Sequence, residues 1–229
     1  MKHKYILVFF LFAPFFLFAQ NETELVKKMK AKLDQVNDYQ ASGTMKIDVS
    51  FIKAPDSYVK VFYKKPNKFT VKKEGGISIL PKGGFSANLN AILIAGNYTV
   101  VPAGETTFKN NKVKVVKLLP LDENSDVVVS TLYIDEKELL VKKSIITTKE
   151  SGTYEMEMTY GKQNNWGLPD NVVFIFSIKD YKLPKGVTFE YESGDKKSKI
   201  DSTEIKKGKV EIIYSNYIVN KGISDSVFE

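Results

Sequence analysis

Apolar residues recur at one period near the amino terminus of this chain and at another period through the rest of it. The first series recurs every three or four positions and consists of Leu25, Met29, Leu33 and Val36. This spacing, with lysines on the other faces, predicts one amphipathic helix over Glu22–Asn37. Asn21 and Glu24 are spaced as a capping box, which predicts that the helix starts there.

Beyond this helix, apolar and polar residues alternate. The first alternating series places four apolar residues on one face: Met45, Ile47, Val49 and Phe51. A period of two predicts a strand with one buried and one solvated face. Further strands are predicted over residues 58–63, 69–71, 98–101, 112–118, 127–134, 139–148, 153–160, 172–178, 187–191 and 210–219. Because about eleven short strands follow one another with turns between them, we expect one continuous antiparallel sheet or barrel.

Four segments interrupt the strands. Pro66 cannot donate a hydrogen bond to a neighbouring strand, so residues 65–67 are expected to form a corner or an edge. Residues 74–84 are rich in glycine and are predicted to be a loop. Ser86–Ala95 is predicted to be a short helix, capped by its own serine and by the glycine that follows. The polar stretch 193–209 is predicted to be a hairpin or loop.

The predicted fold is mainly β with few helices, and its one-sided strands exceed the helices available to cover them. Tyr154, Met156 and Met158 share one strand face, and methionines beside aromatics form an adaptable apolar surface that accepts flexible ligands. An ordinary packed core gives the same pattern on a single strand. With only two helices as cover, however, we expect a cavity or an exposed apolar patch.

The first 19 residues have the pattern of a secretory signal peptide. A basic start with Lys2 and Lys4 precedes an apolar run over Tyr5–Phe18, and Ala19 can stand before the cut. The run is shorter than the roughly 20 residues that span a bilayer, which favours a cleaved signal over an uncleaved anchor. Residues 20–229 are then expected to form a single domain that is soluble outside the cytoplasm.

The composition excludes several kinds of chemistry. All 34 basic residues are lysine, cysteine is absent, and the single histidine, His3, lies in the expected signal peptide. The mature chain would therefore lack histidine- and cysteine-dependent nucleophiles, His/Cys zinc sites, thiol redox chemistry and guanidinium clamps.

The remaining candidates for catalysis or metal binding are weak. Glu155 and Glu157 share a strand face that is expected to be solvated. Asp122, Glu123 and Asp126 surround a turn, but the glycine and the terminal glutamate of an EF-hand loop are missing. We therefore expect no enzyme activity, no cofactor and no metal.

The formal net charge is +7, and it falls to +5 once Lys2 and Lys4 are removed. The lysines are scattered over polar strand faces, and no arginine is present to recognise base edges, so a nucleic-acid partner is not expected. Solvated faces are the default explanation, and attraction to an anionic lipid surface or an acidic partner is the alternative.

Several short motifs follow one another in a characteristic order over about residues 24–178. They are Tyr39-Gln40-Ala41-Ser42-Gly43, Lys64-Lys65-Pro66-Asn67-Lys68-Phe69, Asn97-Tyr98-Thr99-Val100, Lys117-Leu118-Leu119-Pro120, Leu132-Tyr133-Ile134-Asp135, Tyr154-Glu155-Met156 and Leu168-Pro169-Asp170. In this order they resemble the outer-membrane lipoprotein carrier family, the LolA-like proteins, to which LolB and the sigma-regulatory protein RseB are related.

The resemblance implies a half-barrel, in which a curved antiparallel sheet has a concave apolar face covered by the amino-terminal helix and a short lid helix. It implies a monomeric periplasmic carrier that binds the acyl chains of lipoproteins, or other lipids, and works with lipoprotein-sorting components of the inner and outer membranes. The residues expected to line the cavity are Met45, Ile47, Val49, Phe51, Val61, Tyr63, Phe69, Ile92, Leu93, Leu132, Ile134, Tyr154, Met156 and Met158. Lys65 stands where the family usually has an arginine that contacts the lid.

Two alternatives remain open at this point. One is a non-catalytic envelope module on the same fold that binds a protein or senses stress. The other is an outer-membrane barrel, which is less favoured because several predicted strands are shorter than the 9 to 11 residues of a tilted membrane strand.

Overall fold

The computed structural model describes residues 15–49, 55–66, 68–73, 97–150, 152–177 and 207–228, and for residues 15–20 it describes the backbone alone. Its elements, in chain order, are α1 (Phe15–Leu33), β1 (Asp38–Asp48), β2 (Ser57–Lys64), β3 (Lys68–Lys73), β4 (Tyr98–Phe108), β5 (Asn111–Pro120), β6 (Val127–Asp135), β7 (Leu140–Thr148), β8 (Gly152–Thr159), the 3-10 turn η1 (Asn164–Trp166), β9 (Asn171–Ser177), β10 (Lys207–Val219) and the 3-10 turn η2 (Asp225–Phe228). The expected loop over 74–84, the short helix over 86–95 and the strand over 187–191 lie outside the described residues.

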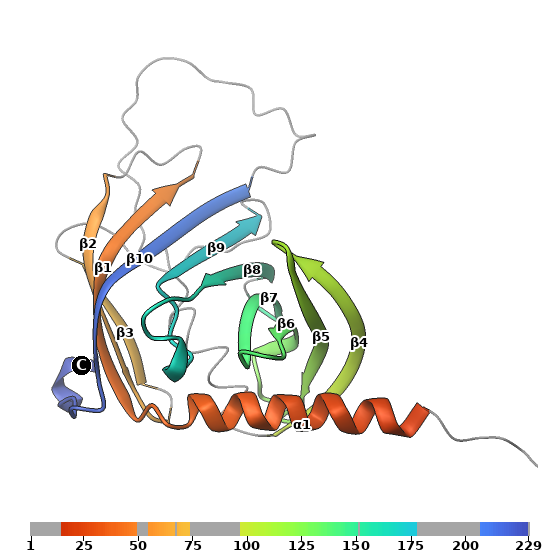
Figure 1. Cartoon of the computed structure of the whole chain (residues 1–229). Helices are drawn as coiled ribbons and strands as arrows, with labels where there is room; N and C mark the ends of the chain where they lie inside the picture. The colour runs from red at the N-terminus through yellow and green to blue at the C-terminus, as the bar shows by residue number, and fades with distance from the viewer. Residues whose placement is uncertain are drawn as a thin grey trace, which may run out of the picture.

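The strands form one ten-stranded sheet in the order β3-β2-β1-β10-β9-β8-β7-β6-β5-β4. Every neighbouring pair is antiparallel. The sheet is strongly curved but not closed, so that β3 and β4 are its two edges (Figure 1). The predicted half-barrel is therefore confirmed.

The carboxyl-terminal strand β10 lies in the middle of the sheet, between β1 and β9. The sequence predicted a strand over residues 210–219 without indicating its position in the sheet, and it assigned residues 207–209 to the preceding hairpin or loop. In the structure Lys207, Gly208 and Lys209 pair with β9, and Lys209 also pairs with Asp48 of β1, so the strand begins three residues earlier than predicted. Without β10, β1 and β9 would each expose an unpaired edge.

Helix α1 runs along one end of the curved sheet (Figure 1). Leu25 and Met29 of the predicted apolar face are buried in the same cluster as the strands, and Leu33 packs against it, which confirms that face within the helix; Val26 is buried beside them. The predicted bounds are wrong at both ends. The helix begins at Phe15, because residues 15–21 contain neither glycine nor proline to end it, and Asn21 therefore lies inside the helix rather than at a cap.

The carboxyl-terminal end of α1 comes earlier than predicted because the chain must turn into β1, which starts at Asp38. The turn is held by Asn220, whose Oδ1 accepts the backbone N–H of Asn37 at 2.7 Å and whose Nδ2 donates to the carbonyl oxygen of Gln35 at 2.8 Å. The Asp38 carboxylate in turn accepts the backbone N–H of Gly222 at 3.0 Å. The segment after β10 thus fixes the connection between helix and sheet.

A β-bulge divides β1 between Ser42 and Gly43 and shifts its register against β10. At the bulge the two backbones come close, since a Cβ on Gly43 would lie 2.4 Å from the carbonyl oxygen of Ile213. The extra residue in β10 brings Tyr214 and Tyr217, three positions apart, to the same concave face, opposite Gly43 and Ala41.

Candidate functional site

The concave face of the sheet carries the predicted cavity residues. One rung runs from Val210 through Phe174, Met156 and Ser144 to Leu132. All described members of the predicted set belong to a single apolar cluster or pack against it: Met45, Ile47, Val49, Val61, Tyr63, Phe69, Leu132, Ile134, Tyr154, Met156 and Met158. Phe51, Ile92 and Leu93 lie outside the described residues.

The centre of the concave face is closely packed, whereas Ile47 and Phe69 of the same set are half-buried. Val61, Leu132 and Ile134 have no exposed surface, and Met158 is the most accessible of the buried set at 9%. A side chain without exposed surface has no water-sized space beside it. A ligand can therefore reach the centre of this face only after a covering group has moved.

Sequence reasoning missed part of this face. Phe174 is fully buried and packs against Tyr154 and Phe176, with ring centroids 5.0 Å and 5.1 Å away. The alternation of Val172, Phe174 and Phe176 in the predicted strand was a sufficient signal for placing them on one face.

A group of tyrosines occupies the end of the concave face near β1 and β10. The ring centroid of Tyr39 lies 5.4 Å from that of Tyr63 and 5.6 Å from that of Tyr217, and Tyr214 lies 5.2 Å from Tyr217. The Tyr217 hydroxyl donates to the carbonyl oxygen of Pro169 at 2.6 Å. Burial raises the pKa of Tyr214 and Tyr217 well above the ordinary value, so these phenols stay neutral.

Lys65 lies at the carboxyl-terminal end of α1. Its Nζ donates to the backbone carbonyl oxygen of Asp34 and lies 4.0 Å from an oxygen of the Asp34 carboxylate. Lys30 approaches the same carboxylate at 2.6 Å. The contact therefore joins the turn after β2 to the end of α1, while the short helix expected as a lid lies outside the described residues.

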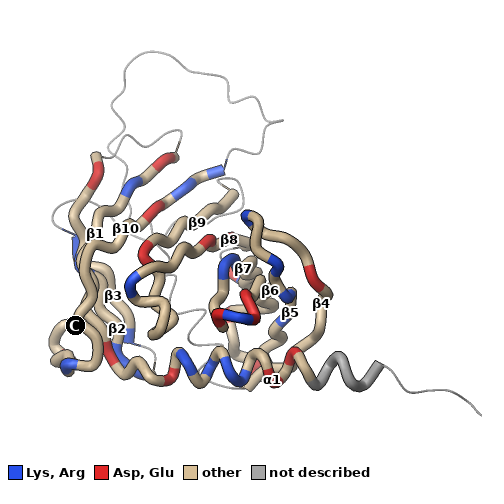
Figure 2. The backbone as a smooth tube through the Cα atoms, viewed as in Figure 1, with Lys and Arg blue, Asp and Glu red and all other residues tan. Residues whose placement is uncertain are grey.

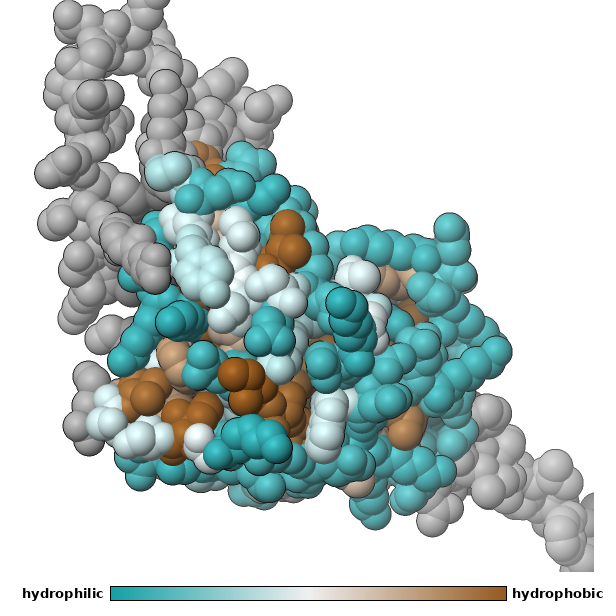
Figure 3. Space-filling model, turned by 60° about the vertical axis from the view of Figure 1, so that its left-hand side comes forward, coloured by the Kyte–Doolittle hydropathy of each residue, from teal (hydrophilic) through white to brown (hydrophobic). Residues whose placement is uncertain are grey.

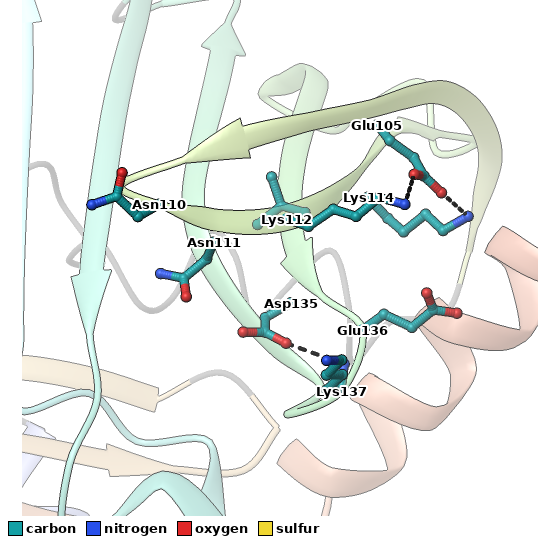
Figure 4. Close-up of a pocket in the computed structure, with 9 residues that line it drawn as sticks. Glu105, Asn110, Asn111, Lys112, Lys114, Asp135, Glu136 and Lys137 are labelled. Atoms are coloured by element: carbon teal, nitrogen blue, oxygen red, sulfur yellow. Dashed lines mark hydrogen bonds and ion pairs between the residues drawn. The ribbon is translucent and has the colours of Figure 1, made fainter.

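A second concavity is polar and lies between the β4–β5 hairpin and the β6–β7 turn (Figure 4). It has a volume of about 290 Å³ and is lined by Glu105, Asn110, Asn111, Lys112, Val113, Lys114, Asp135, Glu136 and Lys137. None of the predicted cavity residues is among them. Glu105 is already paired with Lys112 and Lys114, at 2.6 and 2.5 Å. The lining holds three carboxylates and three lysines, so its formal net charge is zero.

The convex face carries pairs of oppositely charged side chains. Glu155 and Glu157, predicted to share a solvated face, pair with Lys143 at 2.5 Å and with Lys109 at 2.6 Å. Figure 2 shows lysines and carboxylates spread along α1 and over the strands without separating into two patches. Across the described part of the chain, no group of acidic side chains is arranged to hold a metal ion.

Apolar side chains are also exposed on the convex side formed by β2 and β10. Tyr58, Ile213 and Ile218 are exposed by 44%, 39% and 44%. Tyr58 and Ile213 flank Thr44 on the same face, because both are paired with it in the sheet. Figure 3 shows apolar atoms gathered among hydrophilic ones on this side of the molecule.

The structure resembles several solved structures at low sequence identity. A domain assigned to outer membrane lipoprotein sorting from Vibrio parahaemolyticus is 11% identical, with a TM-score of 0.59, over 92% of this chain and 97% of that one. A DUF1329 family protein from Desulfovibrio piger is 12% identical, with a TM-score of 0.55 and the same coverage. A LolA superfamily protein from Nitrosomonas europaea is 10% identical, with a TM-score of 0.50, over 89% and 97%.

The sequence matches no family model and no curated protein. The structural likeness therefore establishes the fold. Within the described residues, no helix has the length and apolarity needed to cross a bilayer.

Proposed function

We propose that this protein, whose fold is LolA-like, is a non-catalytic periplasmic carrier that holds the acyl chains of lipoproteins or other lipids against its concave face for transfer toward the outer membrane. The observation that carries the proposal is the predominantly apolar lining of an open, curved sheet. Burial of an acyl chain contributes about 0.8 kcal/mol per methylene, so this binding needs no catalytic group.

The charge distribution supports the same function. The central rung of the concave face is apolar apart from Ser144, whereas Lys143, Glu155 and Glu157 lie on the convex face. A sheet with one apolar and one charged face can stay dissolved while it shields a hydrocarbon chain. Secretion through a signal peptide cleaved after Ala19 is part of the proposal. The cut would leave the packing residues of α1 in place, since Leu25, Val26 and Met29 all follow it.

Entry of a chain requires the packed face to open. Helix α1 covers one end of the sheet, and its carboxyl-terminal end is held to the turn after β2 by Lys65. We expect the cargo to displace side chains that pack over the concave face of the sheet. The contact between Lys65 and Asp34 would keep α1 attached meanwhile. The sheet itself, with every inner strand paired on both sides, would serve as the rigid wall.

The test is to purify the protein from the periplasm of a producing cell and measure its mass by native mass spectrometry. Co-purified lipid or a lipid-modified protein is expected, together with saturable binding of a fluorescent fatty acyl probe. Protein that carries no lipid and binds no probe, even after partial opening at low denaturant concentration, would overturn the proposal.

A second candidate function rests on the exposed apolar residues of the convex side. Tyr58, Ile213 and Ile218 could contact a protein partner in a non-catalytic interaction or stress-sensing module. If this candidate is right, one protein partner binds in a stoichiometric complex, and Ile213→Lys abolishes that binding. The purified protein then carries no lipid. The carrier function predicts instead that Ile213→Lys leaves lipid binding unchanged.

A further inference from the structure

Two serine hydroxyls are buried in the middle of the concave face. Ser130 on β6 and Ser144 on β7 have no exposed surface. Among the residues that the structure describes, neither Oγ atom has a hydrogen-bond partner. Both side chains point to the concave side, because Ser130 is paired with Ile146 and Ser144 with Leu132, which are themselves buried there.

The surroundings of the two hydroxyls are apolar. On the outer sides of the pair, Ser130 faces Leu118 of β5 and Ser144 faces Met156 of β8. Every cross-strand neighbour of the two serines on this face is therefore a hydrocarbon or thioether side chain. A buried hydroxyl without a partner destabilises the folded state, so the pair is costly unless something else satisfies it.

The two serines occupy one diagonal of a two-by-two block of adjacent rungs. Ser130 is opposite Ile146, and on the next rung of the same face Leu132 is opposite Ser144. Diagonal neighbours in an antiparallel pair are about 7 Å apart. Two hydroxyls at this spacing can each contact a different oxygen of one ligand.

We propose that Ser130 and Ser144 donate hydrogen bonds to the ester carbonyl oxygens of a diacylglyceryl lipid bound to the concave face. The ester end of the ligand then lies over β6 and β7, and its hydrocarbon chains extend along the apolar residues on either side. A carbonyl oxygen fits because it accepts hydrogen bonds and brings no charge into the apolar face. This inference rests on the proposed carrier function and adds the ligand group that it selects.

The test compares two lipids that differ only in the carbonyl groups. Dipalmitoyl phosphatidylglycerol and its dihexadecyl ether analogue are competed against a fluorescent acyl probe on the full mature chain. Each hydrogen bond contributes a factor of about 3 to 10 in affinity, so the wild type is expected to bind the ester lipid at least tenfold more tightly. Ser130→Ala/Ser144→Ala is expected to bind both lipids with the affinity of the wild type for the ether.

Ser177→Ala is the matched control. The Ser177 hydroxyl is also buried and has no partner in the described part of the chain, but it lies on β9 beside Phe176 and points to the opposite face. This variant is expected to keep the preference of the wild type for the ester. A synthetic peptide carrying a dipalmitoylglyceryl cysteine has the same esters, and its affinity relative to the phospholipid tells whether a lipoprotein or a free lipid is the preferred source.

Three outcomes are distinguishable. Equal affinity of the wild type for ester and ether lipids would overturn the role of the serines and leave the carrier function standing. Binding of neither lipid would overturn both the role of the serines and the carrier function.

Thermal unfolding provides a separate check, because removal of two unsatisfied hydroxyls should leave the midpoint of the ligand-free protein unchanged or raise it. A fall of several degrees would show that the hydroxyls have partners within the protein and would also overturn the inference.

Discussion

The Nζ of Lys65 donates a hydrogen bond to the backbone carbonyl oxygen of Asp34, the residue that follows the last turn of α1. Carbonyl groups at the end of a helix lack partners within the helix, and a positive charge there also interacts favourably with the helix dipole. A side chain from the turn after β2 therefore helps to hold the end of the helix against the sheet, together with the contacts of Asn220.

Replacement of Lys65 by methionine should lower the free energy of unfolding by about 1 kcal/mol, because the carbonyl loses a charged donor while the aliphatic part of the side chain is kept. Lys65→Arg should recover most of the loss, since a guanidinium also donates. Chemical denaturation followed by circular dichroism measures both. Lys28→Met, an exposed change on α1, is the control and should stay within about 0.5 kcal/mol of the wild type.

Asn220 should be the most sensitive residue of the carboxyl-terminal segment. It adopts a left-handed backbone with φ 55°, and its side chain bonds to Asn37 and Gln35 on the helix-to-strand turn. Asn220→Gly removes the side-chain bonds alone and should cost about 1 to 2 kcal/mol. Asn220→Ala adds the penalty of a left-handed residue with a Cβ and should cost about 1 kcal/mol more. If Asn220→Gly and Asn220→Ala lowered the free energy of unfolding equally in urea denaturation, the left-handed backbone would contribute nothing to the loss.

The strand pattern was predictable because it depends on local alternation. The series through Met45 and the series through Met156 each place alternate residues on one face. The sheet buries Met45, Val49, Tyr154, Met156 and Met158, and Ile47 is half-buried. Side chains alternate between the two faces of a strand whatever the order of the strands in the sheet. The face of each residue could thus be read before the order of the strands was known.

The position of β10 and the face of Tyr217 could not be predicted in the same way. Pairing of β10 with β1 joins residues such as Tyr39 and Val219, which are far apart in sequence, and no local signal selects that partner. The bulge at Gly43 adds one residue to the partner strand, so a strict alternation from Tyr214 would have placed Tyr217 on the convex face. The unpaired hydroxyls of Ser130 and Ser144 likewise become visible only once their neighbours are known.

Glu105 should give the protein part of its acid sensitivity. Hydrogen bonds from Lys112 and Lys114 lower the pKa of this carboxyl from 4.5 to about 2. A lowered pKa means that the paired carboxylate stabilises the fold fully above about pH 4.5 and loses this effect as the pH falls toward 2.

The thermal midpoint of Glu105→Gln should therefore lie below that of the wild type at pH 6, and the two curves should converge between pH 4.5 and 2. Differential scanning calorimetry across this range measures the convergence. Glu123→Gln, which changes an exposed carboxylate in the turn before β6, is the control for loss of one surface charge. If the offset between Glu105→Gln and the wild type did not shrink between pH 4.5 and 2, the ion pairs of Glu105 would not influence stability.

The last prediction compares one residue on each face of the sheet. Met158 lies at the margin of the concave cluster and is 9% exposed, whereas Ile213 is exposed on the convex face of β10. Met158→Gln keeps the length of the side chain and places an amide in the proposed path of an acyl chain, so fatty acyl affinity should fall at least fivefold through the cost of burying that amide. Ile213→Gln should leave the affinity unchanged. Titration of a fluorescent acyl probe measures both variants, with circular dichroism to show that each remains folded. If the two folded variants lost affinity equally, or if Ile213→Gln alone lost it, the binding surface would not be the concave face.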